Sequence, residues 1–512
     1  MKNYILAHDL GTTGNKASLY DREGHLSGSA FYGYDTEYAH TGWAEQNPQD
    51  WWQAICVSTR KLLQESRVKP DDVACITFSG QMMGCVPLDK SARPLRNAII
   101  WADQRAVEQE RWVGERISPD EVYRITGHRL SASYSLAKML WLRDHQPDLY
   151  RATYKFVHAK DSIAARLTGA FVTDPSDGSS MNLYDLERGE WSARIMDAAG
   201  LDPAQLPTIC QSIDVVGEVL PAVAEEVGVA PGTPVVIGGG DGACAAVGAG
   251  AVREGIAYNY VGSSSWIAFA SPRPIYDPDY KTFTFAHLMP HTFMPTGTMQ
   301  AAGASYQWTR NQLAPLEMEA AEALSLNPYD LMNLSAEKSP PGANGLLFLP
   351  YLMGERSPRW NPQARGAFIG LTIRHTRADM IRAVLEGVTM NLRVILDAFT
   401  TQGAKIDVMR VIGGGARGRL WNRIMADIYG VPVHRLSILE EATSMGAALA
   451  GGVGVGLYRD FSMIDQMNQV AEVIAPDPLA QAAYARTYPI FEAAYHALLP
   501  IYGMIAGMNV KV

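Results

Sequence analysis

A glycine-rich turn near the start of the chain carries side chains that could bind a phosphate group. It reads Asp9-Leu10-Gly11-Thr12-Thr13-Gly14-Asn15-Lys16. Glycine lets the backbone approach an anion closely, and free N–H groups and the two threonine hydroxyls can donate hydrogen bonds to it. The carboxylate of Asp9 suits Mg²⁺, which prefers oxygen ligands. A plain β-hairpin explains the same residues, and this turn alone supports the two interpretations equally.

A second turn of the same kind lies near the middle of the chain. The apolar segment 256–261 leads into Gly262-Ser263-Ser264-Ser265, and a second apolar segment follows at 266–269. Both turns have the order strand, glycine with hydroxyls, strand. They lie roughly half the chain length apart, and two homologous halves facing each other would bring both to one site. The second turn therefore favours the phosphate-binding interpretation.

Asp241 is the candidate general base. It follows three glycines at the end of a predicted strand and precedes the small residues Gly242-Ala243-Cys244-Ala245-Ala246. Unpaired N–H groups at the start of a helix favour an ionised carboxylate, and the glycines leave room for a substrate hydroxyl. An Asp that only caps the helix is the alternative, and from this feature alone it is the more common arrangement.

Two further stretches place polar and aromatic side chains after strands. They contain Gln81, Met82 and Met83, and then Trp101, Asp103 and Arg105. Trp101 could stack on a sugar face, while the acid and the guanidinium bind hydroxyls. A surface turn with an Asp–Arg pair explains the second stretch equally well.

A GxGxxG pattern occurs at Gly413, Gly415 and Gly418, between a predicted strand and a predicted helix. A dinucleotide site of this kind needs an acid about twenty residues further on. That neighbourhood reads Val433-His434-Arg435. A dinucleotide-dependent dehydrogenase rests on these glycines alone, and the same loop could instead lie against an adenine or a ribose. GxxxxGK[ST] and GxSxG do not occur, which disfavours a P-loop nucleotide site and an α/β-hydrolase.

The composition limits the remaining classes of protein. The 512 residues are 47% hydrophobic and carry a net charge of −9, which argues against a nucleic-acid partner because such proteins need a basic face. Five cysteines without a CxxC pattern indicate no disulfide framework and favour a cytoplasmic protein. The weakly polar run 442–457 is shorter than the ~20 residues of a membrane helix, so we expect a buried helix with its exit turn and no membrane partner.

Strands and helices alternate along the chain, which predicts an α/β fold with ligands at the glycine-rich ends of strands. The predicted strands include 4–7, 17–20, 73–78, 235–237 and 408–412. The clearest predicted helix begins with a capping box formed by Thr376 and Asp379. Its apolar residues are spaced by three and four from Ile381 to Phe399, as an amphipathic helix requires.

Taken together, these motifs resemble the FGGY carbohydrate kinases, and most closely their xylulokinase-like branch. The resemblance runs nearly end to end. It rests on the two turns, on Ser79-Gly80-Gln81-Met82, on Gly239-Gly240-Asp241, on Gly354-Glu355-Arg356-Ser357-Pro358, on Arg365 to Leu371 and on Gly413-Gly414-Gly415-Ala416. Several motifs in the family's order are far more specific than any one of them.

The resemblance implies two actin-like (ribonuclease H-like) domains with a cleft between them. The N-terminal domain, 1–250, would bind the sugar and carry the first phosphate turn, and the C-terminal domain, 251–512, would bind ATP. The implied activity is ATP- and Mg²⁺-dependent phosphorylation of a small-molecule sugar. The resemblance leaves a homodimer open.

By position, the resemblance implies Asp241 as the catalytic base and Asp9 as the Mg²⁺ ligand. The residues implied at ATP are Gly11, Thr12, Thr13 and Lys16 at the transferred phosphoryl group, Gly262, Ser263 and Ser264 at the other phosphates, and Gly414, Gly415 and Arg419 at adenosine. The residues implied at the sugar are Gln81, Met82, Met83, Trp101, Asp103, Arg105 and Asp241.

The chain departs from the xylulokinase pattern at two positions. Met83 stands where those enzymes usually have His, and Gly242 stands where Asn or Gln is common. D-xylulose, giving D-xylulose 5-phosphate, is the first candidate substrate, and another ketose, a polyol or gluconate is the alternative. An actin-like ATP-binding protein without a sugar acceptor is the hypothesis from a different class, and Trp101 to Arg105 and Asp241 speak against it.

Overall fold

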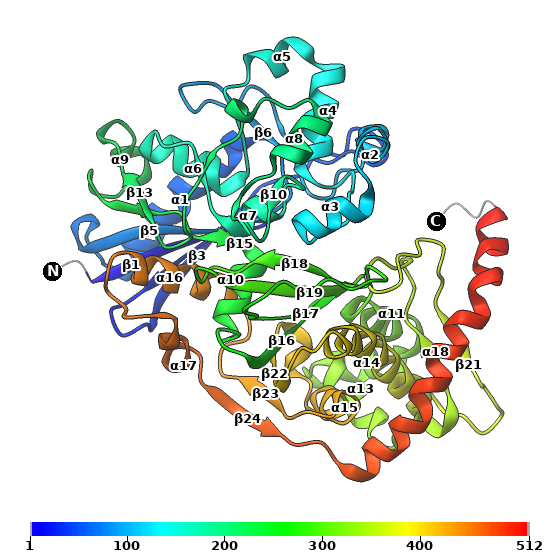
Figure 1. The fold of residues 1–512 in the computed structure, drawn as a ribbon. Helices are drawn as coiled ribbons and strands as arrows, with labels where there is room; N and C mark the ends of the chain where they lie inside the picture. Colours follow the sequence, from blue (N-terminus) through cyan, green and yellow to red (C-terminus); the bar gives the residue numbers. More distant parts are fainter. Residues whose placement is uncertain (1–2, 509–512) are drawn as a thin grey trace.

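Each half of the chain folds around a seven-stranded sheet with helices on both faces (Figure 1). The structure is a computed structural model, and it describes residues 3–508. The first sheet has the order β13-β14-β5-β1-β2-β3, with β15 also paired to β5. Its strands are β1 (Tyr4–Leu10), β2 (Gly14–Tyr20), β3 (Leu26–Gly33), β5 (Val73–Gly80), β13 (Val215–Glu218), β14 (Pro234–Val236) and β15 (Gly239–Gly240).

The second sheet has the order β18-β19-β17-β16-β22-β23-β24. Its strands are β16 (Gly255–Val261), β17 (Ser265–Phe269), β18 (Phe283–Ala286), β19 (Phe293–Met299), β22 (Ile406–Ile412), β23 (Val433–Leu436) and β24 (Val470–Ile474). The predicted α/β class and the predicted strands agree with these two sheets. The glycines that follow the predicted strand 235–237 include the short strand β15.

The two sheets repeat one topology, as the paired turns predict. In the first, β1, β2 and β3 are antiparallel neighbours, and β5 and β14 continue parallel to β1. In the second, β16, β17 and β19 are antiparallel neighbours, and β22 and β23 continue parallel to β16. The turn between β1 and β2 and the turn between β16 and β17 therefore occupy equivalent places.

The helices that follow the strands are also equivalent in pairs. The pairs are α1 (Pro48–Ser66) with α14 (Arg377–Thr401), α6 (Ala159–Thr168) with α15 (Arg419–Tyr429), and α10 (Asp241–Gly248) with α16 (Ala442–Gly454). The predicted capping box is present at the start of α14. The apolar residues of α14 from Ile381 to Phe399 are buried in the core of the second half, which confirms that prediction.

Helices α10 and α16 pack directly against each other. Gly446 of α16 lies against the main chain of Cys244, where an added Cβ would approach the carbonyl oxygen to 2.0 Å. Only glycine permits this distance between the helices. Helix α16 also contacts β1 and β5 of the first sheet, beside which it is drawn in orange in Figure 1. The run 442–457 thus forms the buried helix and exit turn that its small residues predict.

The other helices used below are α2 (Val107–Gly114), α3 (Pro119–Thr126), α4 (Ser135–His145), α7 (Pro175–Ser179), α11 (Gly303–Leu313), α13 (Pro328–Ala336) and α18 (Pro478–Gly507). Among residues 3–508, no helix combines the length and the apolar character needed to cross a bilayer. Within the same range the cysteines form no disulfide.

Candidate active site

Each glycine-rich turn is closed by a backbone hydrogen bond that its first glycine donates, to the third residue on in the first turn and to the second residue on in the second turn. The N–H of Gly11 donates to the carbonyl of Gly14 at 3.0 Å, and the N–H of Gly262 donates to the carbonyl of Ser264 at 3.0 Å. Both are true hairpin turns, so the plain-hairpin description holds for their geometry. Their role toward a phosphate depends on what surrounds them.

The start of α16 contacts the first turn from the other half of the chain. The hydroxyl of Thr443 donates to the Asp9 carboxylate at 2.8 Å. The Lys16 ammonium forms an ion pair with Glu441 at 3.0 Å and donates to the carbonyl of Glu440 at 3.3 Å. The turn of the first sheet and the helix of the second half therefore form one continuous polar surface.

Asp9 lies on that surface in a strongly desolvated position. Burial raises the pKa of its carboxyl group, while the Thr443 hydroxyl and the Lys16 charge oppose this rise. A divalent cation would replace the missing hydration of such a carboxylate, and oxygen is the ligand atom that Mg²⁺ prefers. The donor set at Asp9 thus fits a Mg²⁺ ion.

Asp241 is the first residue of α10, directly after the N-cap residue Gly240. Its Oδ1 accepts the N–H of Gly242 at 2.7 Å, and Oδ2 accepts no hydrogen bond within residues 3–508. Burial raises the pKa of Asp241 to about 7, and the negative charge of Asp9 adds to the rise. A carboxylate with one unengaged oxygen and a pKa near neutrality is suited to accept a proton. The helix-cap interpretation does not fit, because Gly240 holds the N-cap position.

Asp9 of β1 and Gly239 of β15 pair with the same residue, Ser79, from the two sides of β5, so Asp9 and Asp241 lie at the same end of the first sheet. The link to the second turn runs through β16. The Tyr258 hydroxyl donates to the carbonyl of Gly242 at 3.1 Å. Burial and the negative charge of Asp241 raise the pKa of Tyr260, which lies next to the second turn. Asp241, Asp9 and both turns therefore surround one region.

A cavity of about 410 Å³ opens beside the second turn. Its walls include Gly262, Ser263, Gly303, Gly414, Gly415, Arg417, Glu440 and the rings of Tyr306, Tyr329 and Trp421. The second turn is fixed here because the N–H groups of Ala302 and Ala304 donate to the carbonyl of Ser263 at 2.9 and 3.0 Å. Space at Gly414 is open, with no atom within 4 Å of an added Cβ. Glycine backbone, aromatic rings and a guanidinium suit a nucleotide.

Arg419 is not part of this cavity. Its guanidinium donates to Glu472 of β24 at 3.1 Å and is largely exposed. Arg417, two residues earlier, lines the cavity and pairs with Glu440. Ser264 does not line the cavity either. The structure thus places Arg417, and not the predicted Arg419, at the cavity, because the Arg419 side chain at the start of α15 bonds to the adjacent strand.

The predicted sugar residues divide into two groups. Trp101 is 39% exposed, and its indole N–H donates to the Thr12 hydroxyl of the first turn at 2.9 Å. Gln81 is buried, and its amide donates to Gln46 at 2.8 Å. Met82 packs against Gly240, and Met83 is half-buried. Trp101 and Gln81 thus contact the first turn, and Met82 lies beside Gly240 and Gly242 at the start of α10.

Asp103 and Arg105 lie in the protein interior. The two side chains are 0% and 1% exposed, and they pair at 2.7 Å. The Asp103 Oδ2 also accepts the N–H of Ala44 at 2.6 Å, and the guanidinium stacks on Trp43 at 3.7 Å. The Asp–Arg pair of the alternative interpretation exists, but it is buried, and its polar atoms are already engaged. The pair supports the Trp101 loop and offers no free atom to a sugar hydroxyl.

Two groups of residues that contact the candidate site residues are not predicted from the sequence. The first is Lys138 of α4, whose buried ammonium donates to the carbonyls of Met83, Ile100 and Ser133 at 2.7, 2.8 and 2.6 Å. It ties together the two loops that carry Met83 and Trp101. The second is the buried segment from Asp174 to Ser180, which has the composition of an exposed loop. Its Asp-Pro-Ser-Asp start, a typical cap and first helical turn, is the one signal present.

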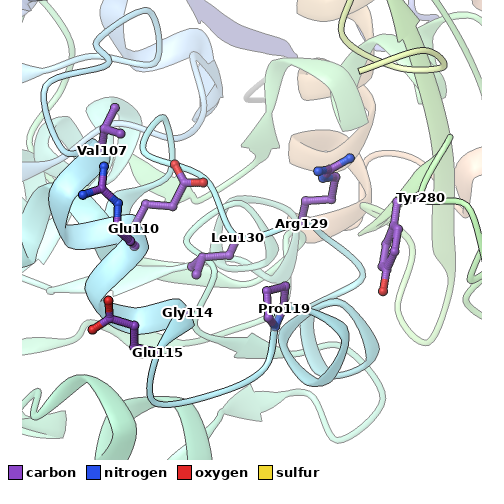
Figure 2. Close-up of a pocket in the computed structure, with 9 residues that line it drawn as sticks. Val107, Glu110, Gly114, Glu115, Pro119, Arg129, Leu130 and Tyr280 are labelled. Atoms are coloured by element: carbon purple, nitrogen blue, oxygen red, sulfur yellow. The ribbon is translucent and has the colours of Figure 1, made fainter. Parts of the chain in front are cut away.

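A separate cavity of about 520 Å³ lies away from this site (Figure 2). It is lined by α2, by Pro119 at the start of α3, by Arg129 and Leu130, and by Tyr280 from the second half of the chain. The Tyr280 hydroxyl donates to Asp120 of α3 at 2.9 Å. None of the predicted site residues lines it, so it is not the site described above.

The chain is similar to known proteins over nearly its whole length. Residues 4–248 match the N-terminal domain, and residues 257–455 the C-terminal domain, of the FGGY family of carbohydrate kinases. A xylulose kinase of Staphylococcus epidermidis is 33% identical, over 97% of both chains. A gluconokinase of Bacillus licheniformis is 31% identical, over 99% of this chain and 98% of its own. The solved xylulose kinase of Lactobacillus acidophilus superposes with a TM-score of 0.90 at 28% identity, over 98% of this chain and 99% of its own.

Proposed function

Because this chain belongs to the FGGY family of carbohydrate kinases, with the actin-like two-domain fold predicted above, we propose that it phosphorylates a hydroxyl of D-xylulose with MgATP as the donor. The observation that supports this most is the Asp241 carboxylate. It has one unengaged oxygen, a pKa raised to about 7 by burial, and Asp9 as its charged neighbour.

In the proposed reaction Asp241 accepts the proton of the sugar hydroxyl as the oxygen attacks the γ-phosphorus of ATP. The bond from that phosphorus to the bridging oxygen breaks, and ADP leaves with the electron pair. Phosphoryl transfer depends mainly on positioning and electrostatic stabilisation. Gly11, Thr12, Thr13 and Lys16 would hold the transferred group by N–H, hydroxyl and ammonium donors.

The nucleotide would occupy the cavity beside the second turn. Gly262 and Ser263 would contact its phosphates, and Gly414, Gly415 and Arg417 its adenosine; all five line that cavity. Asp9 would hold Mg²⁺, which neutralises the charge of the phosphate oxygens when bound. Glu441 pairs with the Lys16 ammonium at the edge of this space. A phosphate oxygen of the bound nucleotide would replace the Glu441 carboxylate as the partner of Lys16.

The charge around Asp241 favours an uncharged substrate. Asp9 and Asp177 both raise the pKa of Asp241 by their negative charges, and the same field repels a carboxylate. Met83 presents an apolar side chain rather than a donor, so it favours neither acceptor, and the choice rests on the charges. A neutral ketose such as D-xylulose suits this pocket better than gluconate does. Gluconate is the second candidate because a gluconokinase matches the chain at 31% identity, close to the 33% of a xylulose kinase.

The division of labour follows the repeat of the fold. We place the domain boundary near residue 250, between α10 and β16, with the sugar in the first domain and the nucleotide in the second. A cytoplasmic location suits an enzyme that consumes ATP, and cysteines without disulfides agree with it.

The proposal is tested by ADP release from the purified protein in the presence of MgATP and single acceptors. The panel holds D-xylulose, other ketopentoses, ketohexoses, polyols and gluconate, with an ATP-only reaction as the control. D-xylulose is expected to give the highest kcat/KM. A higher kcat/KM with gluconate would reassign the substrate, and ADP release at the ATP-only rate with every acceptor would refute the proposed activity.

A further inference from the structure

A short polar segment lies entirely in the protein interior. It runs from Asp174 to Ser180, contains α7, and is called the serine turn below. Five of its side chains are 0% exposed: Asp174, Ser176, Asp177, Ser179 and Ser180. Burying so many polar groups is costly unless each one has a partner, so the partners show what the segment does.

The base of the serine turn is fixed by a buried ammonium group. Lys160 contacts Asp161 at 2.6 Å, Asp174 at 2.9 Å and Asp177 at 3.1 Å. His158 pairs with Asp177 at 3.0 Å. Burial alone would lower the pKa of Lys160, but the three carboxylates raise it well above its ordinary value. His158, Asp161 and Asp177 have the spacing of a metal site, and the Lys160 ammonium already supplies the positive charge there.

The first hydroxyl of the serine turn holds the residue next to the proposed base. The Ser176 Oγ accepts the N–H of Gly240 at 2.9 Å and donates to the Asp174 Oδ2 at 2.5 Å. Gly240 is the N-cap residue of α10, and Asp241 follows it. The orientation of the first turn of α10 is therefore linked through Ser176 and Asp174 to Lys160.

The last hydroxyl of the serine turn holds the sugar side of the site. The Ser180 Oγ accepts the N–H of Met83 at 3.2 Å and donates to the carbonyl of Asp177 at 2.8 Å. Met83 has a φ of +61°, a left-handed conformation that a side chain with a Cβ adopts at a cost. The Ser180 hydroxyl and the Lys138 ammonium, which donates to the Met83 carbonyl, hold this peptide from both sides.

We propose that Ser176 and Ser180 are positioning residues of the kinase reaction, Ser176 for the base Asp241 and Ser180 for the sugar-binding Met83 peptide. The inference rests on the proposed function, since it assigns their effects to phosphoryl transfer. One rigid segment anchored on Lys160 would then fix the distance between the proton acceptor and the bound sugar. Such spacing matters because misplacement by about 1 Å can cost about 100-fold in rate.

The test compares Ser176→Ala and Ser180→Ala with the matched control Ser212→Ala. Ser212 is equally buried, and its hydroxyl donates to the same Asp174 Oδ2 at 2.8 Å, but it contacts neither Gly240 nor Met83 by its side chain. Steady-state kinetics with MgATP and the best acceptor of the panel give kcat and KM separately. Thermal unfolding of each variant measures the loss of stability.

Ser176→Ala is expected to lower kcat by about 10- to 100-fold with the sugar KM within about twofold, because the base is displaced and the sugar is not. Ser180→Ala is expected to raise the sugar KM by about tenfold with a smaller change in kcat. Ser212→Ala is expected to lower the unfolding temperature as much as Ser176→Ala does, with kinetics within about twofold of the parent protein.

Equal kinetic losses in Ser176→Ala and Ser212→Ala would overturn the assignment, since a structural role alone predicts them. If Ser176→Ala does not fold, Ser180→Ala decides, and an unchanged sugar KM in that variant overturns the proposal. A parent protein that phosphorylates no acceptor of the panel would refute the proposed function itself and the inference with it. If the parent protein is active and Ser176→Ala loses no more activity than Ser212→Ala, only the inference is refuted.

Discussion

Replacing the proposed base by its uncharged amide should make the folded protein more stable while it removes the activity. Asp241→Asn keeps the size of the side chain and deletes the charge. The carboxylate of Asp241 is held in a position where burial and the charge of Asp9 disfavour ionisation. The folded state of the unliganded protein therefore bears a cost that the amide does not have.

The expected gain in the free energy of unfolding follows from the pKa of Asp241. The pKa of Asp241 rises from 3.8 to about 7 on folding, and each tenfold change in proton affinity corresponds to about 1.4 kcal/mol. Complete desolvation would thus cost roughly 4 kcal/mol. Because the side chain is partly open to solvent, we expect about half of that, roughly 2 kcal/mol.

The sign of the pH dependence is fixed by the direction of the pKa change. Above pH 7 the carboxylate is ionised in both states, and the folded state bears the full cost. Between pH 7 and 3.8 the folded protein binds a proton that the unfolded chain does not, so the cost falls as the pH falls. The advantage of Asp241→Asn should therefore be largest near pH 8 and absent near pH 4.

The assay is calorimetric unfolding in EDTA without nucleotide at several pH values, together with ADP release at pH 8. Asp71→Asn, an exposed acid at the opposite end of β5 from Gly80, serves as the control and is expected to change neither measurement. An Asp241→Asn variant that unfolds at or below the parent temperature at pH 8 would refute the electrostatic reasoning. One that keeps substantial turnover would remove Asp241 from the role of base.

Three further outcomes are expected. The kcat/KM for the sugar should fall about tenfold from pH 8 to pH 6 as Asp241 with its pKa of about 7 is protonated, and a flat profile in that window would contradict the assignment. Gly446→Ala should destabilise the protein by about 1–3 kcal/mol, because its Cβ would approach a carbonyl oxygen to 2.0 Å. Chemical denaturation measures this change. The control Gly503→Ala, in an open position of α18, should be neutral or slightly stabilising. Arg105→Ala should destabilise the fold by about 3–5 kcal/mol in the same assay, because it leaves the buried Asp103 carboxylate without its ion-pair partner. A drop in activity without loss of stability would indicate instead that Asp103 and Arg105 bind the sugar.

The parts of this structure that sequence predicts well are those governed by local patterns. The glycine–hydroxyl turns, the strands beside them and the capping box of α14 depend on neighbouring residues, so their types and spacing suffice. The position of Asp241 is also local, since glycines and small residues specify a strand end and a helix start. The family motifs add the order of these pieces along the chain.

The predictions that fail depend on residues far away in sequence. Asp103 and Arg105 are predicted to bind the sugar, with a surface pair as the alternative, but Trp43 and Trp141 cover the guanidinium. Arg419 turns outward because its partner, Glu472, lies on the neighbouring strand. No pattern within a few residues of either arginine carries that information.

The serine turn shows the same limit for buried polar groups. Its sequence, Asp-Pro-Ser-Asp-Gly-Ser-Ser, is typical of a solvent-exposed loop. The segment is buried instead, and each buried polar atom then needs a hydrogen-bond partner in the protein. The partners are Lys160, Gly240 and Met83, from three different parts of the chain. Their convergence is a property of the tertiary fold.

The internal repeat explains why the reacting groups meet at one place. Helices α10 and α16 are equivalent elements of the two halves, and they cross where Gly446 meets Cys244. Helix α10 begins with Asp241, and the start of α16 reaches Asp9 and Lys16 through Thr443 and Glu441. One helix crossing thus fixes the proposed base relative to the proposed phosphate turn. A change at the crossing should disturb both together, whereas a change in the serine turn should disturb the base through Ser176 or the Met83 peptide through Ser180 and leave the phosphate turn in place.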